Sequence, residues 1–219
     1  MARGALRLQE EERGRVSREL HDGVGQSLTA LKMQLAIMES EARDRGDDVG
    51  SRLHELCDVA DSALQDVRQL SHLLRPQMLD ELGLVPTVRW LVRTLRARTG
   101  LDVELEHEGL DERIDPELET LAYRMVQEAL NNAAKHAPRS VVRVRLRADG
   151  RRLRVTVADD GPGFDPAAAL GADDSGGFGL RAMRERVQLF GGRLDVQSEP
   201  GRGTTLEAAV PLPAAPGAP

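Results

Sequence analysis

The chain has 219 residues, a formal net charge of −6 and a sequence pI near 5.5. This acidic balance, with aromatic residues at only 2%, argues against a dedicated nucleic-acid binder or a base-stacking platform. A single cysteine, Cys57, excludes an internal disulfide, and no Cys/His cluster has the spacing of a zinc site. No stretch approaches the ~18 apolar residues of a membrane span, and the first residues lack the apolar core of a signal peptide. We therefore expect a cytoplasmic chain with no membrane segment.

The first third of the chain has the pattern of two amphipathic helices. Apolar residues of the first recur at spacings of three and four, at Val16, Leu20, Val24, Leu28, Leu31, Leu35 and Met38. The second follows a heptad, with Leu53, Ala60, Val67 and Leu74 at one position and Leu56, Ala63 and Leu70 at the other. The polar stretch 43–51 between them predicts a turn. One hairpin does not enclose its own apolar stripe, so we expect two copies to pair as a homodimeric four-helix bundle.

A mixed pattern follows the hairpin. Pro76 is expected to end the second helix, residues 76–86 to form a linker, and Gly100 to cap a helix over 85–99. Asp115 followed by Pro116 predicts the start of a helix that ends at His136. Alternating residues predict strands at 101–107, 142–146, 153–157, 194–197 and 204–210, with a glycine-rich loop over 161–179 and a helix over 180–190. The arginines at 143, 145, 147, 152 and 154 are interpreted as a solvated sheet face.

The fold class expected is therefore α+β, with a dimeric helical hairpin followed by an α/β sandwich. The predicted domains are residues 1–78 and 79–211, and residues 212–219 are expected to form a disordered tail.

A polar segment interrupts the first helix at Arg-Glu-Leu-His-Asp-Gly-Val-Gly-Gln, residues 18–26. Two glycines inside a helix cost about 1 kcal/mol each relative to alanine, which suggests another purpose for this segment. His21 has two interpretations: a buried polar residue that fixes dimer register, or a reactive imidazole at the stripe edge, about 100° from Leu20. In the second, Asp22 would hold the ring tautomer or accept a proton, and Gln26 would orient a water.

A second polar group lies on the helix that follows Pro116. Glu128, Asn132 and either Lys135 or His136 share one helix face. An asparagine oxygen suits Mg²⁺, and the two cationic side chains suit phosphate oxygens. The alternative is an ordinary exposed helix face.

Glycines accompany polar residues at three later positions. Asp159 ends a strand before Gly161 and Gly163, so that its carboxylate would meet an exocyclic amine while the glycines admit a flat ring. Further along, Gly177, Gly179 and Leu180 open a helix whose N–H groups suit an anion. Thr204 faces the covered side of its strand, which suggests a polar group at a pocket floor. A plain turn and a threonine bonded to backbone remain the alternatives for the first and last of these.

The order of these elements resembles the sensor histidine kinases of two-component systems, over about residues 10–211. The segment at 18–26, with a short glycine lid and no aromatic-rich box, is similar to the nitrate-sensor subfamily, whose partners are NarL-type regulators. The first part then resembles a dimerisation and histidine phosphotransfer domain. The second resembles the Bergerat-fold (GHKL) ATPase shared with gyrase, Hsp90 and MutL. Asn131 stands where threonine is common and Ala182 where glycine is usual, and neither change removes a functional group.

The resemblance implies roles for these residues. His21 would be the phosphoacceptor, Asp22 would assist autophosphorylation, and Gln26 would orient the water of a phosphatase reaction. In the ATPase domain, Glu128 and Asn132 would form the N-box pair, with Asn132 on Mg²⁺. The remaining nucleotide contacts would come from Lys135, His136, Asp159, Gly161, Gly163, Gly177, Gly179, Leu180 and Thr204.

The expected cofactors are ATP and Mg²⁺. The expected partners are a second copy of the chain and a response regulator of the helix-turn-helix type, with no direct nucleic-acid contact. The chain is expected to act as the cytoplasmic part of a sensor, with a hinge around residues 76–84. Two alternatives belong to other functional classes. One is an anti-sigma-type Ser/Thr kinase, which would have neither the His21 segment nor the long hairpin. The other is a non-catalytic nucleotide-binding scaffold. A chaperone-like ATP-driven machine would need further transducer domains.

Overall fold

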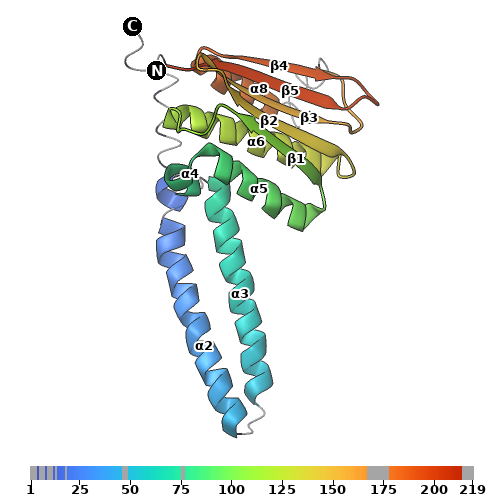
Figure 1. The fold of residues 1–219 in the computed structure, drawn as a ribbon. Helices are drawn as coiled ribbons and strands as arrows, with labels where there is room; N and C mark the ends of the chain where they lie inside the picture. The colour runs from blue at the N-terminus through green and yellow to red at the C-terminus, as the bar shows by residue number, and fades with distance from the viewer. Residues whose placement is uncertain are drawn as a thin grey trace. The chain divides into compact units, whose positions relative to one another are not determined.

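The computed structural model describes residues 4, 8, 12, 14–17, 19–45, 49–74, 77–166 and 178–213 (Figure 1). The chain divides into two compact units at Gln77 and Met78. Within the described residues, no helix is both long enough and apolar enough to cross a bilayer. For His21 and Asp22 the structure describes the backbone alone, and Gly177 lies outside the described residues.

The first unit is built on a helical hairpin. A π-helix, η1 (Leu20–Gly25), leads into α2 (Gln26–Arg45), and α3 (Val49–Leu74) runs antiparallel beside it (Figure 1). Polar contacts between described residues of α2 and α3 include an ion pair from Lys32 Nζ to Asp61 at 2.6 Å and a contact of 3.3 Å from His54 Nδ1 to Glu39. In each of these two contacts, the midpoint of the two residue numbers lies between 46 and 47. The predicted turn 43–51 is too long, since helix continues to Arg45 and resumes at Val49, and residues 46–48 lie outside the described residues.

The buried stripe of α3 differs from the predicted heptad at one of its two positions. Leu53 and Ala60 are buried as predicted, but their partners are Cys57 and Leu64. Leu56 is instead 50% exposed. Within the single chain, the hairpin therefore buries a stripe of α3 that is turned by one residue from the predicted one. Among the described residues of the hairpin, the large apolar side chains that remain exposed include Leu31, Met38, Leu56 and Val59.

The predicted linker 76–86 is wrong in its central part, because this segment folds. Two helices lie there, α4 (Gln77–Leu82) and α5 (Leu84–Thr99), joined at Gly83 with a φ of 84°. Leu79 of α4 is 1% exposed and belongs to the core of the second unit. Residues 78–84 are thus not a free hinge. The predicted cap at Gly100 is confirmed, with a φ of 72° and an N–H bond to the carbonyl of Arg96.

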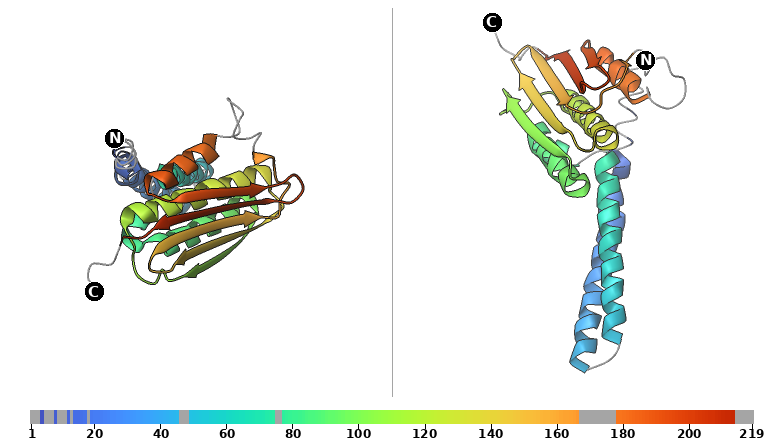
Figure 2. Two further views of the ribbon diagram at one scale, coloured as in Figure 1. Left: turned by 90° about the horizontal axis from the view of Figure 1, so that it is seen from above. Right: turned by 90° about the vertical axis from the view of Figure 1, so that its right-hand side faces the viewer.

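The second unit contains one five-stranded sheet. Its strands are β1 (Asp102–Glu108), β2 (Val141–Ala148), β3 (Arg152–Asp159), β4 (Arg193–Ser198) and β5 (Thr204–Pro211), in the order β1-β2-β3-β5-β4. The β1–β2 pair is parallel, as the crossover through α6 (Pro116–His136) requires, and the other pairs are antiparallel. Helices α5, α6 and α8 (Phe178–Leu189) cover one face of this sheet (Figure 2). The predicted α+β class is confirmed.

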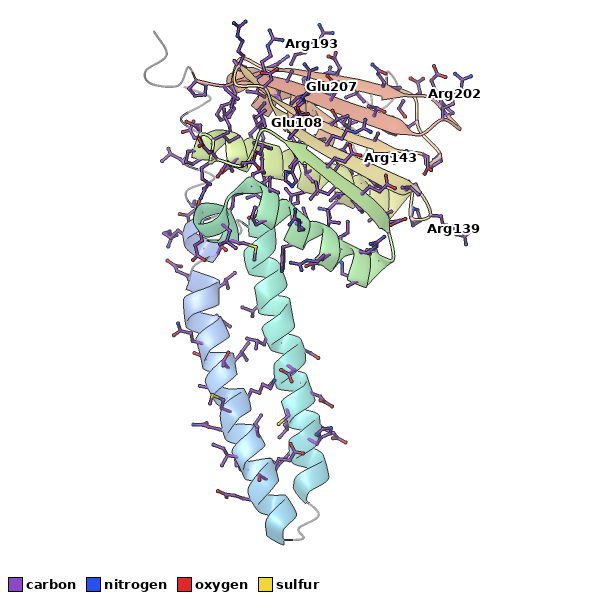
Figure 3. All side chains as sticks on the ribbon, in the orientation of Figure 1. Glu108, Arg139, Arg143, Arg193, Arg202 and Glu207 are labelled. Atoms are coloured by element: carbon purple, nitrogen blue, oxygen red, sulfur yellow. The ribbon has the colours of Figure 1, made fainter. Side chains whose placement is uncertain are left out.

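Strand alternation separates the two faces of the sheet. Val142, Val144 and Leu146 are at most 1% exposed and pack toward the helices. The arginines between them point to the open face, where Figure 3 shows the side chain of Arg143. There they pair with carboxylates on neighbouring strands: Glu104–Arg143, Glu106–Arg145, Glu108–Arg147 and Arg154–Glu207. The face is therefore solvated and nearly charge-balanced, as the sequence analysis expects.

Candidate functional site

Helix α6 forms one wall of a cavity in the second unit. Its start is fixed by Asp115, whose Oδ1 accepts hydrogen bonds from Glu117 N at 2.8 Å and Leu118 N at 3.3 Å. Further along, Ala129, Ala133 and Ala137 line the cavity. Because these side chains are small, they leave room between the helix and the ends of β3 and β5.

The cavity has a volume of about 380 Å³. Its lining is mostly apolar, with a few polar groups that converge on it, as in many small-molecule sites. The lining residues are Ala129, Asn132, Ala133, His136, Ala137, Val157, Asp159, Pro162, Gly163, Phe164, Leu180, Thr204 and Leu206.

Asp159 is the carboxylate in this wall. It is the last residue of β3, and its Oδ1 accepts a hydrogen bond from Gly161 N at 2.9 Å. Partial burial raises the pKa of this carboxyl above its ordinary value, against the opposing effect of the N–H groups of Gly161 and Thr204. The adjacent Asp160 accepts instead from Val141 N at 2.8 Å, at the start of β2. Only the first of the two aspartates therefore lines the cavity.

Two glycines let the loop after β3 lie directly on the β4–β5 turn. Gly163 has a φ of 60°, and a Cβ there would overlap the carbonyl oxygen of Glu199. Gly203 has a φ of 78°, and a Cβ there would overlap the carbonyl oxygen of Asp159. A backbone bond of 2.6 Å from Gly201 N to Pro162 O joins the same two segments. The edge of the cavity is therefore held in place by contacts that a side chain would prevent.

Ser198 connects this loop to Thr204. Its Oγ accepts from Phe164 N at 2.9 Å, donates to Gly203 O at 2.9 Å, and lies 3.0 Å from Thr204 Oγ1. Thr204 lines the cavity, on the side that its strand parity predicts. The sequence analysis missed Ser198. Its position opposite Thr204 in the β4–β5 register is the signal that would have found it, once the two strands were paired.

Glu128 and Asn132 lie together on α6. The amide Nδ2 of Asn132 donates a long bond of 3.5 Å to Glu128 Oε1, and Asn132 lines the cavity. Gly179, in the first turn of α8, packs so closely on Glu128 that a Cβ there would overlap Oε1. Leu180, the next residue, lines the cavity and is buried. The start of α8 thus lies beside the polar stripe of α6.

The structure brings most of the predicted nucleotide-site residues to this cavity. Asn132, His136, Asp159, Gly163, Leu180 and Thr204 line it, and Gly161 bonds to Asp159. Lys135 is exposed and does not line the cavity, although it shares the end of α6 with His136. Gly177 lies outside the described residues.

The other predicted site residues belong to the first unit. His21 and Asp22 lie within η1. Two hydroxyls of α2 donate to carbonyl oxygens of η1: Ser27 Oγ to Gly23 O at 2.9 Å, and Thr29 Oγ1 to Gly25 O at 2.8 Å. The estimate of about 100° between Leu20 and His21 assumed an α-helix. It does not apply to this π-helical turn, a geometry that is frequent at functional sites. Gln26 is exposed and lines a hollow of about 310 Å³ between α2 and α3.

Comparisons with known proteins match both units. Residues 12–79 match the family model described as histidine kinase. Residues 117–214 match the histidine kinase-, DNA gyrase B-, and HSP90-like ATPase model. The chain is 36% identical over 208 residues to the signal transduction histidine-protein kinase/phosphatase DegS of Brevibacillus brevis, covering 94% of this chain and 53% of DegS. It is 38% identical over 203 residues to the sensor histidine kinase MctS of Rhizobium johnstonii, covering 93% of this chain and 44% of MctS.

A solved structure gives the same assignment for the fold. The histidine kinase domain of the blue-light activated histidine kinase of Erythrobacter litoralis EL346 has a TM-score of 0.52 at 23% identity, covering 85% of this chain and 94% of that domain. The chain spans about half the length of the curated relatives it matches. Taken with the two family models, these matches show that the chain belongs to the sensor histidine kinases.

Proposed function

We propose that this chain is the catalytic core of a two-component sensor histidine kinase. ATP binds in the cavity of the second unit, its γ-phosphoryl group passes to His21, and an aspartate of a response regulator then accepts that group. The observation that carries the proposal is the half-buried Asp159 carboxylate, which lines the same apolar cavity as Asn132. The chain also contains the segment 18–26 with His21.

The cavity fits an adenine nucleotide. Its volume of about 380 Å³ lies within the ordinary range of roughly 300–1,000 Å³ for ligand sites. The alanine face of α6 and the Val157–Leu206 floor would hold a flat ring, while Asp159 accepts a hydrogen bond from an exocyclic amine. Asn132 and His136 lie further along the wall, where the phosphates would follow, and the exposed Lys135 and the Gly177–Gly179 segment would contact them there.

The same residues fit Mg²⁺. This ion prefers oxygen ligands and keeps several waters and phosphate oxygens around it, so a single protein ligand suffices. Asn132 supplies that ligand, because its Nδ2 is directed toward Glu128 and its amide oxygen is then left for the cation. When bound, Mg²⁺ would neutralise the charge of the phosphates. Glu128 positions the Asn132 amide and would also activate the attacking group.

His21 is the proposed nucleophile. A neutral imidazole attacks phosphorus without metal activation near pH 7, and Asp22 would hold its tautomer or accept its proton. Gln26 follows at the end of the π-helical turn with an exposed amide, where it would orient water for a phosphatase reaction. The name of DegS includes such an activity.

The proposed partners are a second copy of this chain and a response regulator. The uncovered apolar residues of α2 and α3 support pairing into a four-helix bundle. The regulator is proposed to be a helix-turn-helix transcription factor. A protein that uses ATP and such a partner works in the cytoplasm, on its own or as part of a larger sensor.

The test is transfer from ATP labelled at either end of the triphosphate, with Mg²⁺ and the full chain. We expect label from the γ-position and none from the α-position. Asp159→Asn is expected to abolish labelling. Asp160→Asn, the neighbouring carboxylate that bonds to Val141 N and does not line the cavity, is expected to label normally. Label from the α-position, or equal labelling of the two variants, would contradict the proposal.

A further inference from the structure

We propose that Ser198 is a specificity-determining residue, because it fixes which way the Thr204 hydroxyl points its proton. It thereby makes the cavity select a purine with a 6-amino group over one with a 6-oxo group. This inference rests on the proposed function, since it assumes that the cavity binds a purine nucleotide.

The argument starts from the three partners of Ser198 Oγ. Phe164 N, at 2.9 Å, can only donate, and the carbonyl oxygen of Gly203, at 2.9 Å, can only accept. The structure gives the single proton of Ser198 to the carbonyl oxygen of Gly203. The third contact, 3.0 Å to Thr204 Oγ1, is then a hydrogen bond only if Thr204 donates. One arrangement of protons satisfies all three contacts, and it uses the Thr204 proton.

Thr204 consequently offers lone pairs to the cavity that it lines. Asp159 stands directly opposite Thr204 in the β3–β5 register and lines the same cavity. When ionised, its carboxylate also accepts only. At this end of the cavity, two neighbouring side chains therefore offer acceptors and no donor.

The two classes of purine differ in the substituent at position 6, which would contact Thr204 and Asp159. A 6-amino group carries two N–H donors and is satisfied by acceptors. A 6-oxo group carries lone pairs and would face the lone pairs of Thr204 and Asp159 unpaired. Polar sites discriminate strongly when the wrong ligand leaves buried groups without a partner.

Removal of the Ser198 hydroxyl frees the Thr204 proton. The Thr204 hydroxyl then has no acceptor at position 198 and can rotate to donate into the cavity, where a 6-oxo group would accept. Ser198→Ala should therefore weaken ADP binding more than binding of its 6-oxo analogue IDP. We expect the ratio of the two dissociation constants to narrow by about tenfold.

The experiment is calorimetric titration of the full chain with ADP and with IDP, in the presence of Mg²⁺. The wild type is expected to prefer ADP by on the order of 100-fold or more. Ser198→Ala and Ser198→Cys should both lower the ratio of the IDP dissociation constant to the ADP dissociation constant. Ser198→Thr keeps the hydroxyl and should keep the ratio of the wild type. Thr120→Val is the matched control, because it removes a hydroxyl that bonds to Pro116 O at 2.8 Å and does not line the cavity.

A double variant identifies the route. If Ser198 acts through Thr204, Ser198→Ala should have no further effect on the ratio in a Thr204→Val background. Equal losses of ADP and IDP affinity in Ser198→Ala and Ser198→Cys would overturn the inference, because a merely structural role predicts an unchanged ratio. A wild type that binds neither nucleotide would instead overturn the proposed function.

Discussion

Asp159 combines a role in the site with an unfavourable environment. Partial burial raises its pKa, so the folded chain binds the carboxyl proton more tightly than the unfolded chain does. This group therefore favours folding most below its unfolded pKa of about 3.9, and that contribution is lost as the pH rises through the folded pKa. At neutral pH the ionised carboxylate destabilises the protein that carries it. The free energy of unfolding is lower at neutral pH because a charged hydrogen-bond acceptor is held in an apolar cavity.

Asp159→Asn should accordingly stabilise the nucleotide-free protein at pH 7, and the difference should close as the pH falls toward 4. Urea unfolding followed by the fluorescence of Trp90 measures this, because Trp90 is the chain's single tryptophan and lies in α5 of the second unit. A variant that is less stable at pH 7, or a difference that widens in acid, would contradict this account of Asp159.

Nucleotide should reverse that order of stability. A ligand at 100 times its dissociation constant stabilises the folded state by about 2.7 kcal/mol. We expect ADP with Mg²⁺ to stabilise the wild type and Asp160→Asn in this way, and to leave Asp159→Asn unchanged. The Trp90 unfolding curves at several ADP concentrations provide the measurement. Equal stabilisation of the two variants would place the base contact elsewhere.

At the scale of elements, a half-buried ion pair helps to attach α4 to the rest of the second unit. Arg113 bonds to the carboxylate of Glu119, at 2.8 Å through Nε and 2.6 Å through Nη2, and Glu119 is 2% exposed. The same guanidinium donates to the carbonyls of Leu79 and Asp80 at 3.1 Å each. These bonds hold the end of α4 on the ATPase domain.

Arg113→Met removes the guanidinium and leaves Glu119 buried without its partner. The loss of one member of a buried pair costs about 3–5 kcal/mol, and the partial exposure of Arg113 places our expectation near the lower end, at about 3 kcal/mol. Arg96→Met is the control, because its pair with Asp102 is more than half exposed on both sides and should cost less than about 1 kcal/mol. Equal losses of unfolding free energy in Arg113→Met and Arg96→Met, measured by Trp90 fluorescence, would contradict the proposed stabilising role of Arg113.

Most elements of the second unit could be predicted from the sequence, because their signals are local. Asp115 with Pro116 marks the start of α6, Gly100 the end of α5, and alternation marks the strands. The fold of 77–82 could not be predicted this way, since it depends on Arg113, more than 30 residues away along the chain. The π-helical turn at 20–25 likewise escapes a reading that assumes one helical period throughout.

The same distinction applies to the site. Asp159, Asn132 and Thr204 could be identified from local signals: a strand end before glycines, a polar stripe on a helix, and a polar residue on an otherwise apolar strand face. Ser198 could not, because its importance comes from hydrogen bonds to two other segments, the loop after β3 and the start of β5. The stripe on α3 shows a related limit: a heptad gives the period, but the neighbouring helix decides which side is buried.

At the scale of the whole molecule, the uncovered apolar residues of α2 and α3 predict a dimer. Leu31 and Leu56 are 46% and 50% exposed in the single chain. Sedimentation equilibrium at micromolar concentration should give a dimer for the wild type. Leu31→Glu with Leu56→Glu should give a monomer, because a charge on that face would have to be buried. Gln34→Glu, at an exposed polar position of α2, should remain dimeric. A monomeric wild type would contradict the four-helix bundle.

The central claim is that His21 accepts the phosphoryl group. We would incubate the full chain with γ-labelled ATP and Mg²⁺, and compare the wild type with His21→Gln and with His54→Gln, a histidine of the same unit that pairs with Glu39. The account predicts label on the wild type and on His54→Gln that resists alkali and is lost in acid, and no label on His21→Gln. Acid-stable label, or label that survives the His21 substitution, would contradict it.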